Sequence, residues 1–137
     1  MPRCDPVRRW GSRAGLTRLE VVVLVAGVLL LVVFAVVQLG ARRERGRLAA
    51  MEESLRRLAV AQESFAYDRG GYTGNLGALR ERGLEMDAAV AITVHEATRR
   101  GWSASATHDA TARGCYVFTG EAAPIGAATT AGTIACD

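Results

Sequence analysis

The hydrophobic pattern of the chain is dominated by one unbroken apolar run of seventeen residues, Val21 to Val37. As a helix with a rise of about 1.5 Å per residue, this run would be about 26 Å long, which is close to the hydrocarbon thickness of a bilayer. A single helix satisfies its own backbone hydrogen bonds in lipid, whereas a single strand does not. The pattern therefore predicts one membrane-spanning helix, which we place at residues 16–40.

Beyond a basic cluster at positions 42–47, the pattern changes to that of an amphipathic helix. Apolar residues recur at spacings of three, four, three and seven: Leu48, Met51, Leu55, Leu58 and Phe65. Gln62 occupies the remaining position of this stripe. A stripe of this kind packs one face of a helix against another layer. Gly70 and Gly71 predict the end of the helix, because glycine commonly follows the last helical residue.

The second half of the chain has the alternation of apolar and polar residues that is typical of β-strands. A short helix is expected at 76–82, ahead of strands containing Val90 to His95, Trp102 to Thr107, Cys115 to Thr119 and Thr133 to Cys136. Turn residues separate these segments, so we predict an antiparallel meander of three or four strands. The helical stripe would cover one face of the sheet, and residues 122–132 would form a surface loop. The predicted fold class is α+β, with residues 41–137 as the globular domain.

The first fifteen residues differ in character from the rest. They are short, contain Arg3, Arg8, Arg9 and Arg13, and have the composition of a targeting leader. The whole chain has 17 arginines and no lysine against 14 acidic residues, giving a net charge of +3. Asp5 and the four arginines make the leader itself +3, so residues 16–137 would be neutral. Overall charge thus gives no reason to expect nucleic-acid binding.

Three cysteines are present, and Cys4 belongs to the leader. Removal of the leader would leave Cys115 and Cys136 as an even pair. In a domain outside the cytoplasm such a pair favours a disulfide. Two buried free thiols are the alternative.

Motifs that carry catalysis are absent from the sequence: it has no glycine-rich phosphate loop, no Gly-x-Ser-x-Gly and no His-Glu-x-x-His. His95 and His108 are isolated, and Asp109, Glu121 and Asp137 are too scattered to indicate a calcium site from spacing. We therefore expect neither an enzyme, nor a bound cofactor, nor a metal site.

The residues that join the leader to the apolar run are Gly15-Leu16-Thr17-Arg18-Leu19-Glu20. They resemble the processing site of type IV pilins and of the pseudopilins of type II secretion, in which a membrane peptidase cuts after the glycine. Arg18 occupies a position that is usually apolar in that family. The resemblance implies cleavage between Gly15 and Leu16, N-methylation of Leu16, and a pilin-like fold with a long helix packed on a small sheet.

The same resemblance implies a location and a set of partners. The protein would be a single-pass protein of the inner membrane with its C-terminal domain outside the cytoplasm. It would then assemble into a filament. Its partners would be the prepilin peptidase, other pilin or pseudopilin subunits and an assembly platform protein.

Glu20 is the residue to which we assign assembly on chemical grounds. A carboxylate at the edge of an apolar span is unfavourable without a partner. Cleavage after Gly15 would create an amine on Leu16 with an ordinary pKa of about 8, which is mostly protonated at neutral pH. The amine of one subunit could neutralise Glu20 of the next and so set the register between them. The alternative is an acidic residue at the start of a helix, lying at the level of the lipid headgroups.

Two other functions remain open on the sequence. The chain could be a single-pass anchored protein whose outer domain binds a partner, with its leader retained and no filament. It could also be a secreted protein with an ordinary signal peptide, cut after the apolar run near Gly40-Ala41.

Overall fold

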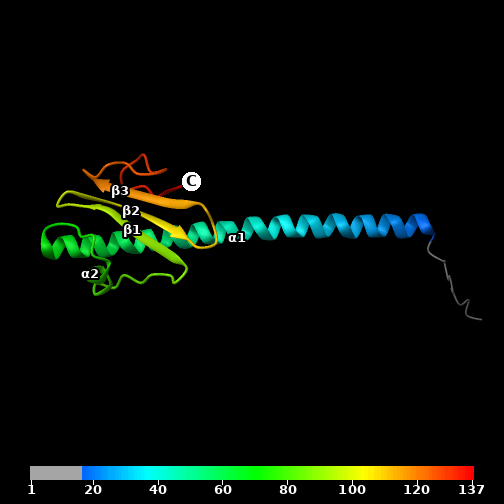
Figure 1. Ribbon diagram of the computed structural model, residues 1–137, viewed down its shortest axis with the longest axis horizontal. Helices are drawn as coiled ribbons and strands as arrows, with labels where there is room; N and C mark the ends of the chain where they lie inside the picture. The colour runs from blue at the N-terminus through cyan, green and yellow to red at the C-terminus, as the bar shows by residue number, and fades with distance from the viewer. Residues whose placement is uncertain (1–16) are drawn as a thin grey trace, which may run out of the picture. The chain divides into compact units, whose positions relative to one another are not determined.

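The computed structural model describes residues 17–137 and shows an α+β protein with one long helix and one antiparallel sheet (Figure 1). Four strands are adjacent in chain order, which confirms the predicted meander. The elements are α1 (Arg18–Arg69), α2 (Leu76–Arg80), β1 (Val90–Ala97), β2 (Gly101–His108), β3 (Gly114–Gly120) and β4 (Ala135–Cys136). The chain divides into two units at Gln38 and Leu39, which we describe in turn.

The described part of the first unit consists of α1 from its start up to Gln38. Every described residue of this stretch is exposed, including all of Val21 to Val37. Leucine and valine dominate the helix over several turns and on all sides, so no polar face balances the apolar one.

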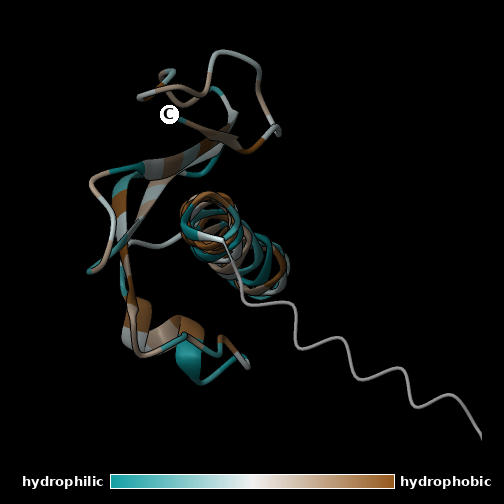
Figure 2. Cartoon of the chain, turned by 90° about the vertical axis from the view of Figure 1, so that its right-hand side faces the viewer, coloured by the Kyte–Doolittle hydropathy of each residue, from teal (hydrophilic) through white to brown (hydrophobic). Residues whose placement is uncertain are grey.

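In the second unit, α1 covers one face of the sheet (Figure 2). Met51, Leu55 and Leu58 are fully buried and belong to one core with residues of β2 and β3. Leu48 and Phe65, the outer members of the predicted stripe, are half-buried against the same core. Full burial of each large apolar side chain contributes about 1.5–3 kcal/mol, so this stripe holds helix and sheet together.

The helix ends where the sequence predicted. Gly70 follows the last helical residue with a φ of 74°, a left-handed conformation that costs glycine little, and its N–H donates to the carbonyl of Ala66. The short helix α2 then begins at Asn75, whose side-chain oxygen accepts hydrogen bonds from the N–H groups of Gly77 and Ala78. This is the usual capping role of asparagine.

The opposite face of the sheet is also covered. Residues 122–132 form the predicted loop and most of them are exposed, but Ala122 and Ala128 are buried against Phe118 in a second, smaller core. The physical reason is the two-residue period of β3: Cys115 and Val117 face α1, so Phe118 must face away from it. The loop supplies the cover that Phe118 needs.

Candidate membrane and assembly segment

The two residues predicted to flank the cleavage site, Gly15 and Leu16, lie outside the described residues. The structure begins at Thr17, which caps α1. Its hydroxyl oxygen accepts a hydrogen bond of 3.2 Å from the N–H of Glu20, and its carbonyl accepts one of 3.1 Å from the N–H of Val21. The first bond satisfies the N–H of Glu20, which has no backbone partner inside the helix, and the second is the first regular backbone bond of α1.

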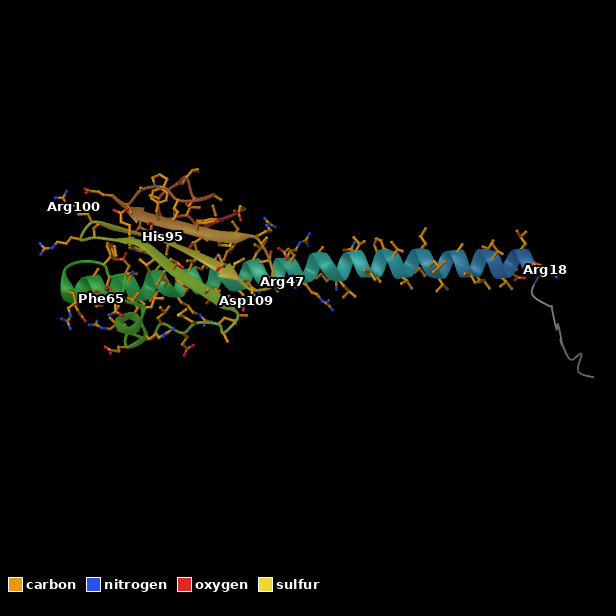
Figure 3. The ribbon with its side chains drawn as sticks, viewed as in Figure 1. Arg18, Arg47, Phe65, His95, Arg100 and Asp109 are labelled. Carbon is orange, nitrogen blue, oxygen red and sulfur yellow. A yellow bond between two sulfur atoms is a disulfide. The ribbon has the colours of Figure 1, made fainter. Side chains whose placement is uncertain are left out.

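Glu20 is the third residue of α1 and immediately precedes the apolar run. Its side chain is exposed, and within residues 17–137 its carboxylate accepts no hydrogen bond and joins no ion pair. Arg18 lies at the first position of the helix and likewise forms no ion pair with Glu20 (Figure 3). The negative charge at the edge of the apolar run is therefore not neutralised by the described part of the chain.

Thr17 is a capping residue that we did not predict, although the sequence contained a signal for it. The four residues from Thr17 to Glu20 fit the Thr-x-x-Glu capping pattern ahead of an apolar run. Only half of that pattern is formed, because the Glu20 carboxylate does not bond back to the backbone of Thr17. The helix start thus depends on Thr17 and leaves the Glu20 carboxylate for another role.

The apolar run is exposed to a degree that is unusual for such residues. The large apolar side chains from Val21 to Val37 are between 43% and 72% exposed. Exposed apolar surface of this extent requires a lipid, protein or other apolar environment to cover it. By length and composition this part of α1 is a candidate span of a membrane, and helices in other settings meet the same criteria.

Just beyond the run, Glu44 is held by residues of the globular domain. Thr111, from the turn after β2, donates a hydrogen bond of 2.6 Å to one carboxylate oxygen of Glu44, and Arg47 donates one of 3.1 Å to the other. The hydrogen bond from Thr111 is the main cause that lowers the pKa of Glu44, and the charges of Arg47 and Arg113 add to it. Glu44 and Thr111 are 67 positions apart, so no local pattern could have predicted their contact. Figure 3 labels Arg47 on α1.

Cys115 and Cys136, the two cysteines expected to pair, are direct cross-strand partners of β3 and β4 and form a disulfide. Cys115 is fully buried in the main core. The bond closes the chain segment that covers Phe118, so it fixes both β4 and the loop before it.

Several other polar side chains of the domain have structural partners, although Trp102 Nε1 and Thr119 Oγ1 are buried without one within the described residues. His95 bonds to the hydroxyl of Ser105 over 2.8 Å, and the Nδ1 atom of His108 accepts from the N–H of Ala110. Glu121 pairs with Arg100 over 3.2 Å, and Asp137 accepts from the N–H of Gly114. Within the described residues, histidine, cysteine and acidic side chains form no group of three that could hold a metal ion.

Neither a protein-family model nor a curated protein matches this chain.

Proposed function

We propose that this protein is a structural subunit, a minor pilin or a pseudopilin, of a type IV pilus or a type II secretion filament. The observation that carries the proposal is the juxtaposition of Glu20, unpartnered within residues 17–137, with a helix whose apolar residues from Val21 to Val37 are all exposed. A helix of this kind needs an apolar environment, and a carboxylate at its edge needs a cation. Packing against other copies of the same helix provides both.

In this proposal the precursor spans the inner membrane once, with residues 1–15 in the cytoplasm and the globular domain outside it. A prepilin peptidase cuts between Gly15 and Leu16 and methylates the new amine. The amine of Leu16 then lies near Glu20 of a neighbouring subunit, where the pair fixes the stagger between helices. An assembly platform protein moves the subunit from the membrane into the filament.

The pilin-like fold is part of the same proposal. It is supported by the order of elements, with an apolar helix that continues into the amphipathic cover of a small antiparallel sheet. It is supported further by the disulfide in the last strands, since such bonds form in compartments outside the cytoplasm.

A test is to express the gene in its host with and without the leader peptidase and to shear filaments from the cells. We expect the protein in the sheared high-molecular-mass fraction only when the peptidase is present. Recovery of all the protein as single subunits in the membrane, with the peptidase active, would contradict the proposal.

One observation favours a second function, that of a membrane-anchored binding domain. A groove of about 540 Å³ lies in the second unit between α1, β3 and the segment before β4. Its lining includes apolar Val60 and Ile134 and charged Glu52 and Arg56. Grooves of this size and character accommodate small ligands or peptide side chains. A protein with this function would keep residues 1–15, so an uncut leader distinguishes it from a filament subunit.

A further inference from the structure

We propose that Arg42, Arg43 and Arg45, which we call the arginine collar, bind the phosphate groups of anionic phospholipids. The inference rests on the membrane span of the proposed function and adds the class of lipid that the span would select. It concerns the membrane-inserted subunit before it joins a filament.

The position of the collar along α1 matches the headgroup layer of a bilayer. Arg42 and Arg45 follow Val37 by five and eight residues. In a helix with a rise of about 1.5 Å per residue, they lie about 7–12 Å beyond the apolar run. The polar layer on each side of a bilayer is about 5–8 Å thick, and a long arginine side chain extends back toward it.

The collar arginines form no ion pair among the described residues, in contrast to several other arginines of the globular domain. Arg47, Arg56, Arg57, Arg82 and Arg100 each pair with a carboxylate. The three collar arginines are exposed, and none of them forms an ion pair within residues 17–137. Their guanidinium groups therefore keep donors for an external acceptor, and the planar fork of arginine fits phosphate oxygens in pairs.

The single carboxylate inside the basic cluster is directed elsewhere. Glu44 lies between the collar arginines in sequence, but its two oxygens accept from Thr111 and Arg47. At 3.6 residues per turn, Glu44 shares the side of α1 that faces the sheet. Arg42 lies nearly opposite to it, and Arg43 and Arg45 lie about 100° to either side. The fold thus separates Glu44 from the collar and leaves a cluster of three positive charges. Each arginine close to a membrane surface is attracted to anionic lipid headgroups.

The experiment uses the full chain in nanodiscs made of phosphatidylcholine with a minor fraction of phosphatidylglycerol. Native mass spectrometry after release from the nanodiscs counts the two lipids that remain bound. We expect the wild-type chain to retain phosphatidylglycerol preferentially. In R42Q/R43Q/R45Q this preference should fall on the order of tenfold or more. The charge-preserving R42K/R43K/R45K should keep most of it.

The matched control is R69Q/R80Q/R99Q, which removes the same charge from exposed arginines that follow Val37 by at least 32 positions in the sequence. An equal loss in this control, or no loss in the collar variant, would overturn the proposal. Normal lipid preference together with failed filament assembly in the collar variant would also overturn it, because the collar would then serve contacts between subunits.

The experiments distinguish a failure of the lipid-binding proposal from a failure of the filament proposal. A chain that does not enter nanodiscs lacks the span on which both depend. A chain with the lipid preference but an intact leader in its host would overturn the filament proposal and leave the collar supported.

Discussion

The side-chain amide of Gln62 pairs with the backbone of Thr73 through two hydrogen bonds. Its Nε2 atom donates to the carbonyl of Thr73 over 2.6 Å, and the N–H of Thr73 donates to its Oε1 atom over 3.0 Å. Gln62 is fully buried in the core-facing stripe of α1. The pair therefore fixes the connection between α1 and α2 and satisfies polar groups that the core would otherwise leave without partners.

Replacing Gln62 by leucine should lower the free energy of unfolding by about 1–3 kcal/mol, because the backbone groups of Thr73 lose their partners. Urea unfolding of the full chain in detergent micelles, followed by tryptophan fluorescence, measures this change. Gln38→Leu is the matched control, since Gln38 is the other glutamine and is exposed on the same helix. Equal stability of the two variants would contradict the role of the pair.

Breaking the disulfide should destabilise the domain and uncover its second core. For a loop closed by cysteines 21 positions apart, the loss is about 3 kcal/mol by the chain-entropy argument. The Cys136→Ala variant should therefore unfold at a lower urea concentration than the wild type. The backbone amide of Ala128 should also exchange its hydrogen faster in this variant than in the wild type. Cys4→Ala should match the wild type, and a wild type treated with reductant should behave like Cys136→Ala. Unchanged exchange at Ala128 would show that the loop packs without the bond.

Glu44 should make stability depend on pH in a defined direction. Its pKa is lowered in the folded state from the ordinary value of 4.5, chiefly by the hydrogen bond from Thr111. The stabilisation is therefore fully present above pH 4.5 and is lost as pH falls through the lower, folded-state pKa. Thr111→Val should reduce this loss between neutral and acidic pH. A carbon-13 titration of the Glu44 carboxyl in both proteins measures the cause directly. An identical titration midpoint for the Glu44 carboxyl in the wild type and in Thr111→Val would refute the role of the hydrogen bond from Thr111.

Glu20→Gln should leave membrane insertion intact and greatly reduce incorporation into filaments, because the neutral amide no longer compensates the Leu16 amine. Quantifying the protein in sheared and membrane fractions of host cells tests both statements. Glu81→Gln is a suitable control, since Glu81 is exposed and lies in the globular domain. Normal assembly of Glu20→Gln would remove the register role from this carboxylate.

Much of the fold could be predicted because its determinants are local. The apolar run, the stripe from Leu48 to Phe65 and the glycine stop at Gly70 each depend on residues a few positions apart. The strands were predictable for the same reason, and Trp102, Ala104 and Ala106 lie in the main core as their alternation indicated. Helix α1 continues through Gly40 and Gly46 without interruption.

The unpredicted features depend on contacts between distant residues. The pattern of β3 shows that Phe118 faces away from Val117, but not that Ala128 will cover it. Likewise, Gln62 is a polar residue in an otherwise apolar helical stripe, and the sequence does not show that it bonds to Thr73. At the start of α1, the sequence identified Glu20 and its apolar setting. The cap from Thr17 was present in the sequence as a pattern that we did not use.

We propose that the chain is trimmed after Gly15 so that a charged amine can meet Glu20 in a neighbouring subunit. The most direct measurement is the mass of the N-terminal peptide of the protein isolated from sheared filaments of its host. The account predicts a peptide that begins at Leu16 and carries an N-methyl group. A peptide that retains Met1 to Gly15, in cells with an active leader peptidase, would contradict it.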